Sequence, residues 1–346
     1  MVGDLELRVR FASRLVVACC AVAVGCCAVP SGSTRSLVAQ EKPAAAQPVP
    51  AAATAPAAAP TTPASPSTPS PPPLDGRDGR ELSLRLFRPK PVIKVDEHLL
   101  ERAKFPVVDT HTHFRIRTRH SPEQRDGLVE MMDRNNIAIC VSLDGGWGDA
   151  FDEHSAYLWT KYRDRFVIFA NIDWRGAGRE DDPSTWDCLR EDFPRRAAER
   201  LADAKRRGAS GVKIFKEFGL GYKNADGSLI KVDDPRWDEI WRACGELGLP
   251  VLMHTGDPSA FFAPIDPTNE RWEELSRRPE WSFADRSKFP SRDELFAARN
   301  KVVERHPKTQ FIAAHFGNDG EDFKTLATWL DRYHTMPWSE GSTARR

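Results

Sequence analysis

Two histidines lie two residues apart, directly after a short apolar run. They are His111 and His113 in FPVVDTHTHF, residues 105–114. Side chains alternate between the two faces of a strand, so both imidazoles are predicted to lie on the same face. Neutral imidazole binds zinc and similar divalent ions, and a catalytic zinc site has about three such ligands with one position open. The spacing therefore predicts part of a metal site, although two ordinary strand-end residues would show the same pattern.

Three further candidates belong to later apolar runs. His254 ends PVLMH, His315 ends QFIAAH, and Lys213 lies inside GVKIF. A histidine that ends a buried strand is either a ligand or a core residue whose hydrogen bonds are satisfied. An isolated ammonium is costly to bury, so Lys213 must pair with a charge or face a polar cavity. The other histidines lie in polar, helical or loop contexts and are predicted to be surface residues: His98, His120, His154, His306 and His334.

The candidates belong to alternating strands and helices that begin at residue 105. Continuous apolar runs bounded by polar turns are typical of parallel strands that are covered on both faces. Helix starts are indicated by Ser121, Pro122 and Gln124, and again by Ser291 with Glu294. Repeated strand and helix units imply an α/β fold, either a barrel or an open doubly wound sheet. The predicted strands are residues 106–110, 137–143, 166–172, 211–215, 250–254 and 310–315.

The strand ends favour the barrel. In a (β/α)8 barrel every strand delivers its carboxyl-terminal residues to one shared mouth. No glycine-rich phosphate fingerprint follows the first run, as a dinucleotide-binding fold would require. We therefore predict a TIM-like (β/α)8 barrel. The polar and aromatic residues at its strand ends are His111, His113, Asp144, Trp147, Asn171, Asp173, Trp174, Lys213, His254, His315 and Asn318.

The motifs at four of these strand ends carry a family resemblance. HTH, GVKIFK, VLMHTGDP and FIAAHFGN, in this order, resemble the amidohydrolase superfamily over about residues 92–333. They are most similar to the amidohydrolase-related branch that includes aminocarboxymuconate semialdehyde decarboxylase. The resemblance implies a divalent metal, zinc or a similar ion, held by His111, His113 and His254. It makes His315 a second-metal ligand or a catalytic group beside the metal-bound water. Lys213 is then a candidate carbamylated bridge between two metals, or an ion-pair partner at the barrel rim.

The resemblance implies metal-dependent hydrolysis of a small organic substrate. Two alternatives stay open: non-oxidative decarboxylation of a small unsaturated or aromatic carboxylic acid, and a non-catalytic, truncated exported protein. The family's pattern ends with an aspartate after strand eight, in a GTD or GSD context. No such motif follows His315, and no strand-like run follows Tyr333. We therefore expect a barrel that is truncated after strand six, from a truncated or frame-shifted product or from a naturally short form.

The first 75 residues predict export. Three arginines precede an uninterrupted apolar run from residue 15 to residue 29, which is the pattern of a signal peptide and too short for a comfortable membrane span. We assign residues 1–39 to this peptide, with cleavage near Ala39 favoured over lipid attachment at Cys26. Residues 40–75 form an Ala/Pro-rich segment, predicted to be a disordered linker. Residues 76–346 form the barrel domain of a periplasmic or extracellular protein.

Composition limits the partners. Lys and Arg together number 50, as do Asp and Glu, and no basic run interleaved with aromatic residues is present. We therefore expect a small-molecule substrate and no nucleic acid. A membrane is expected as a partner only through a lipid on Cys26, and the oligomeric state is left open. The segment of residues 257–290 is long enough to be a lid or a binding element. Its aromatic residues either hold it against the barrel or contact the substrate: Phe261, Phe262, Trp272, Trp281 and Phe283.

Overall fold

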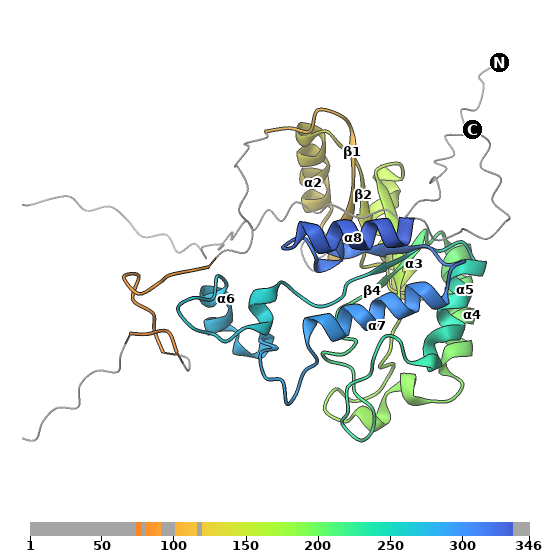
Figure 1. The fold of residues 1–346 in the computed structure, drawn as a ribbon. Helices are drawn as coiled ribbons and strands as arrows, with labels where there is room; N and C mark the ends of the chain where they lie inside the picture. Colours follow the sequence, from red (N-terminus) through yellow and green to blue (C-terminus); the bar gives the residue numbers. More distant parts are fainter. Residues whose placement is uncertain (1–73, 78–79, 91–100, 116–119, 335–346) are drawn as a thin grey trace, which may run out of the picture. The chain divides into compact units, whose positions relative to one another are not determined.

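The computed structural model describes residues 74–77, 80–90, 101–115 and 120–334 (Figure 1). The predicted signal peptide, Cys26 and Ala39 lie outside the described residues, as does the linker up to residue 73. Residues 335–346 also lie outside them. Export and lipid attachment therefore stay predictions. Within the described part of the chain, no helix is long and apolar enough to cross a membrane.

All six predicted strands are confirmed. They are β1 (Val107–Thr112), β2 (Ile137–Ser142), β3 (Phe166–Asn171), β4 (Gly211–Ile214), β5 (Val251–Met253) and β6 (Phe311–Ala313). The α-helices of the described residues are α2 (Pro122–Asn135), α3 (Asp149–Tyr162), α4 (Phe193–Arg207), α5 (Asp238–Glu246), α6 (Trp272–Arg277), α7 (Arg292–Arg305) and α8 (Phe323–His334). Short 3-10 helices include η4 (Ser259–Phe262) and η6 (Ala314–Asn318).

The strands form one parallel sheet in the order β1-β2-β3-β4-β5-β6. Each strand pairs with the next one along the chain, so every connection returns the chain to the same end of the sheet. A doubly wound sheet would instead reverse its strand order at a switch point. The predicted TIM-like α/β architecture is thus confirmed, and the described residues supply six of its strands. The truncation after strand six stays a prediction.

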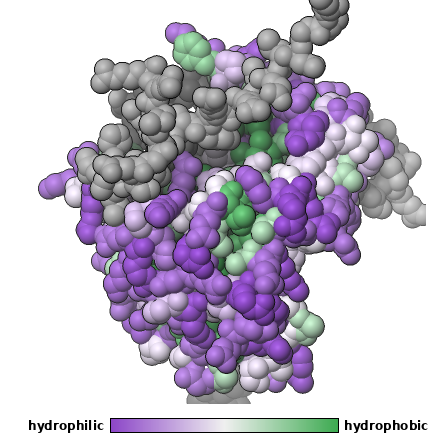
Figure 2. Space-filling model, turned by 90° about the vertical axis from the view of Figure 1, so that its right-hand side faces the viewer, coloured by the Kyte–Doolittle hydropathy of each residue, from purple (hydrophilic) through white to green (hydrophobic). Residues whose placement is uncertain are grey.

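Alternation along the strands separates two apolar layers. In β5, Leu252 faces inward and packs with Leu143, Phe169 and Ile312. Its neighbour Val251 faces outward and belongs to the cluster between sheet and helices. This is the two-residue period of a strand buried on both faces, which explains why the runs are continuously apolar. The face drawn in Figure 2 is mostly hydrophilic, with hydrophobic residues gathered in a narrow patch near its centre.

The predicted helix starts are also confirmed. The side chain of Ser121 accepts a hydrogen bond from the amide of Gln124 at the start of α2, where Pro122 is the first helical residue. At the start of α7, Ser291 and Glu294 form both hydrogen bonds of a capping box. Helices α7 and α8 lie side by side in Figure 1, and the indole of Trp329 on α8 donates to a side-chain oxygen on α7.

Candidate metal centre

Three histidines from three strand ends converge at the mouth of the sheet. His111 comes from β1, His254 directly follows β5, and His315 lies in η6 after β6. One ligand atom from each lies within 4.8 Å of the other two. The ring centroids of His111 and His315 are 4.5 Å apart, and those of His254 and His315 are 4.7 Å apart. Parallel strands bring residues that are distant in sequence to one end of the sheet, as a barrel requires.

All three imidazoles are held in the neutral form. Burial is the main cause that lowers the pKa of His111 to about 2 and that of His315 to about 4, and it also lowers the pKa of His254 well below its usual range. The nearby ammonium of Lys213 is the second cause of each of these shifts. Nδ1 of His111 is buried and has no hydrogen-bond partner among the described residues. Neutral imidazole is the form that binds metal, so the donor set fits a divalent ion.

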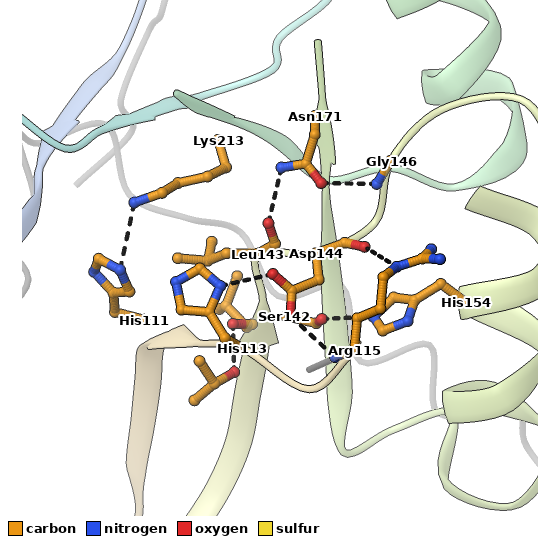
Figure 3. Close-up of polar contacts among 12 residues, drawn as sticks. His111, His113, Arg115, Ser142, Leu143, Asp144, Gly146, His154, Asn171 and Lys213 are labelled. Carbon is orange, nitrogen blue, oxygen red and sulfur yellow. Dashed lines mark hydrogen bonds and ion pairs between the residues drawn. The ribbon is translucent and has the colours of Figure 1, made fainter. Parts of the chain in front are cut away.

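His113 lies beside this cluster and is held by an aspartate. Its ring centroid is 5.3 Å from that of His111, and its Nδ1 is 2.6 Å from an Asp144 carboxylate oxygen (Figure 3). The other Asp144 oxygen accepts from the backbone amide of Arg115. Burial by itself would raise the pKa of Asp144, but the bond and charge of His113 lower it overall. A carboxylate on one ring nitrogen presents the other nitrogen as a metal ligand.

The structure therefore places the predicted ligands in two groups. His111 and His254 belong to the converging cluster, and the third member is His315, for which the resemblance implies a second-metal or catalytic role. His113 is a neighbour of the cluster, so its assignment as a ligand stays a prediction. Asp144 was recognised in the sequence only as a polar strand end. Its pairing with His113 joins β1 to β2 and depends on strand register.

Lys213 points from β4 into the same site. Its Nζ lies 3.3 Å from Nε2 of His111, and its residue is 1% exposed. The side chain thus faces a polar cluster, as the cost of burying an ammonium requires. A second lysine, Lys216, forms an ion pair with Asp257 at 2.5 Å. Burial raises the pKa of Asp257, and the positive charge of Lys216 opposes that shift.

The backbone that carries His315 has an unusual conformation. His315, Phe316, Gly317 and Asn318 have φ values of 54°, 55°, 67° and 61°, which is a run of left-handed residues. The left-handed region costs about 1–2 kcal/mol for each residue that has a Cβ. Such a turn persists only where its surroundings determine it, and such turns cluster at functional sites. The GN dipeptide is the one local signal of this turn in the sequence.

A second histidine network lies behind the cluster, between β2 and α3. Nε2 of His154 is 2.7 Å from the hydroxyl of Ser142, and its Nδ1 is 3.0 Å from Nε2 of His120. His120 in turn contacts the carboxylate of Glu153 at 3.1 Å. His154 is 0% exposed, so the prediction that it is a surface residue is wrong. Its polar neighbours on α3 concealed the fact that this helix turns His154 toward the sheet.

Residues 257–290 pack against the domain through their aromatic side chains. Phe261 and Phe283 are buried in a cluster with Leu275 and Leu295 of α7. The indole of Trp272 donates to the backbone oxygen of Gly76. These contacts hold the segment against the domain. The alternative role of the aromatic residues, substrate contact, stays a prediction.

A cavity of about 220 Å³ lies between the ends of β4 and β5 and the start of α7. Most of its lining is apolar, and Ile214, Phe218, Met253 and Leu295 contribute to it. His254 is the one member of the histidine cluster that lies on its wall. An enclosed apolar space of about 150 Å³ is large enough to bind benzene. The cavity could therefore hold a group of about that size.

The family is shown by a direct match. The family model described as amidohydrolase matches residues 108–340, so the chain belongs to the amidohydrolase family. This family is typically metal-dependent, and the three-histidine cluster lies within the matched residues.

Solved structures show similarity at low identity. One is 2,6-dihydroxybenzoate decarboxylase in complex with 2,6-dihydroxybenzoate, at 16% identity and a TM-score of 0.34, with 64% of each chain covered. The 2,6-dihydroxybenzoate decarboxylase from Rhizobium matches at 17% identity and a TM-score of 0.34, again with 64% of each chain covered. An amidohydrolase from Mycobacterium avium subsp. paratuberculosis matches at 18% identity and a TM-score of 0.32, covering 60% of this chain and 51% of that one. This chain thus spans less than two thirds of the length of these proteins.

Proposed function

We propose that this protein is a metal-dependent hydrolase that acts on a small organic substrate through a metal-activated water. The observation that carries the proposal is the convergence of His111, His254 and His315 within 4.8 Å. Burial keeps these imidazoles neutral and ready to bind a cation. Membership of a typically metal-dependent family supports the same function. Zn²⁺ is the ion that we propose, because imidazole nitrogen is one of its preferred ligands.

The residues around the cluster have distinct roles in this proposal. A divalent ion would lower the pKa of a water to about 7 and polarise a carbonyl. Asp144 holds the ring of His113 through Nδ1 and so fixes which nitrogen the ring presents. The ammonium of Lys213, beside His111, stabilises negative charge that develops on a carbonyl oxygen. The cavity next to His254 offers space for a small apolar substituent.

Metal analysis of the purified protein tests the premise. We expect His111→Ala and His254→Ala each to lose bound zinc, because each removes one imidazole of the cluster. His113→Ala and His315→Ala decide which of these residues supplies the third ligand. His306→Ala is a matched control, since His306 binds Asp238 at 3.0 Å in another part of the fold. Unchanged zinc content in His111→Ala combined with His113→Ala would show that the site is misread.

A substrate screen tests the reaction class. Esters, lactones and amides are paired in it with aromatic and enoic carboxylic acids. Hydrolytic turnover that disappears with zinc removal is the expected result. Carbon dioxide release without hydrolysis would overturn the proposal in favour of decarboxylation. Zinc binding without turnover of either kind would favour a non-catalytic protein.

Export is a separate proposal that rests on the first 75 residues. Cleavage near Ala39 predicts a mature protein free in the periplasm or outside the cell. Lipid attachment at Cys26 predicts instead that the protein partitions with membranes and that Cys26→Ser releases it. Mass spectrometry of the mature N-terminus distinguishes the two. Recovery of an intact Met1 terminus from the cytosol would exclude both.

A further inference from the structure

The side chain of Asn318 connects the two turns that carry His254 and His315. Asn318 ends the left-handed turn after β6 and is buried. Its Nδ2 donates to the backbone oxygens of Thr255, at 2.6 Å, and of Gly256, at 3.0 Å. Because both acceptors are carbonyl oxygens, the pair of bonds also fixes the orientation of the amide. Thr255 directly follows His254, so one amide spans both histidine-bearing turns.

Two arginines of α7 hold the same turn from the other side. Nη1 of Arg299 donates to the backbone oxygen of Gly317 at 2.6 Å, and Arg292 donates to the backbone oxygen of Asn318. The guanidinium of Arg299 lies over the rings of Phe296 and Trp329, which fixes its own position. A Cβ on Gly317 would lie 2.9 Å from Nη1 of Arg299, so a larger residue at this position would displace the guanidinium. Three groups of the left-handed turn are thus held by hydrogen bonds: the backbone oxygens of Gly317 and Asn318, and the side-chain amide of Asn318.

We propose that Asn318 is a positioning residue that sets the separation of the His254 and His315 imidazoles and so prepares the cluster for metal. The proposal rests on the proposed metal-binding function. His315 approaches His254 and His111 from a backbone conformation that L residues rarely adopt, and Asn tolerates that region better than most residues. The side-chain amide of Asn318 also links this turn directly to the residues that follow β5. A residue that only tolerates the left-handed conformation would not provide this link. Neither Asn318 nor Arg299 belongs to the ligand group itself.

Two substitutions separate the amide from the backbone conformation. Asn318→Gly keeps access to the left-handed region but removes both bonds to the β5 turn. Asn318→Asp keeps the shape but turns a carboxylate oxygen toward two carbonyl oxygens. Asn136 offers a matched control, because it is left-handed, with a φ of 60°, and its Nδ2 donates to the oxygen of Ala103 at 3.0 Å. It precedes β2, at the end of the sheet opposite the histidines.

The first measurement is the affinity of the full-length protein for Zn²⁺, by competition with a chromophoric chelator. Loss of an outer hydrogen-bond partner lowers metal affinity by about 10- to 100-fold, and we expect both Asn318 variants to fall in this range. The same substitutions at Asn136 should leave the affinity unchanged. The visible spectrum of bound Co²⁺ should also change only in the Asn318 variants. Wild-type affinity in both Asn318 variants would overturn the proposal.

A second measurement needs no metal and keeps the two proposals separable. The backbone amide of His254 donates to the backbone oxygen of Ile214, and the backbone amide of Ser259 donates to the carboxylate of Glu321. Hydrogen exchange of these amides in metal-free protein should accelerate in the Asn318 variants and not in the Asn136 variants. Equal exchange in all of them would overturn the positioning role. Wild-type protein that binds no Zn²⁺ would refute the proposed function, and the exchange result would still decide the role of Asn318.

Discussion

Acid lability is predicted from His154, the buried histidine between β2 and α3. Burial, with Arg115 and His120, lowers its pKa from 6.5 to about 4, against the opposing charges of Asp144 and Glu153. The unfolded chain therefore takes up a proton as the pH falls below about 6.5, whereas the folded protein resists protonation until about pH 4. Unfolding is favoured progressively across that window.

The magnitude follows from the same two values. Each pKa unit by which the folded and unfolded states differ is worth about 1.36 kcal/mol when the full difference is expressed. His154 therefore accounts for about 3 kcal/mol of lost stability at pH 4 and for about 2 kcal/mol at pH 5. Above about pH 6.5 the contribution of His154 to the pH dependence vanishes. His154→Gln removes the titrating ring and should flatten this part of the profile. Subtracting the variant from the wild type removes the effects of the other buried histidines.

Urea unfolding followed by tryptophan fluorescence, from about pH 7 to about pH 4.5, measures the difference. Ser142→Ala is the control, because it removes the hydroxyl bonded to His154 and leaves the ring in place. It should lower the free energy of unfolding at every pH by about 1–3 kcal/mol, the cost of an unsatisfied buried polar group. Its pH slope should match that of the wild type. Identical slopes for wild type and His154→Gln would refute the assigned pKa.

Three further substitutions test the site and the core. Asp144→Asn should weaken Zn²⁺ binding by about 10- to 100-fold if His113 is a ligand, and unchanged affinity in a chelator competition would remove His113 from the ligand set. Lys213→Met removes a positive charge 3.3 Å from Nε2 of His111, and like charges a few ångströms apart cost about 1–4 kcal/mol. It should tighten Zn²⁺ binding at least about fivefold, whereas loss of metal would favour a carbamylated bridge. Leu252→Ala should destabilise the inner apolar layer by about 2–5 kcal/mol in urea unfolding, and a change below about 1 kcal/mol would contradict its place there.

Strands and helix starts were predictable because their causes are local. The alternation of Val251, Leu252 and Met253 between two apolar layers depends on the strand period alone. The capping box of Ser291 and Glu294 involves residues three positions apart, so its pattern is visible in the sequence. The order of strands followed from the barrel, which the polar residues at the strand ends favoured over a doubly wound sheet.

The candidate site was predictable as a set of residues and less so as an arrangement. Spacing placed His111 and His113 on one strand face, and the structure agrees that they are neighbours. The position of His113 in the site depends on Asp144, which comes from another strand. The place of His315 depends on a left-handed turn held by arginines of α7. No local pattern contains these long-range contacts.

The sequence by itself determined the barrel-type α/β fold, the amidohydrolase resemblance and the strand ends that carry imidazoles and Lys213. Each of these depends on residue type and on spacing along the chain. Only the tertiary structure decided which three histidines converge and which are neutral, because burial sets a pKa and burial comes from elements far apart in sequence. His154 shows the same limit, since its hydrophilic neighbours predicted a surface residue and the packing of α3 on β2 buried it.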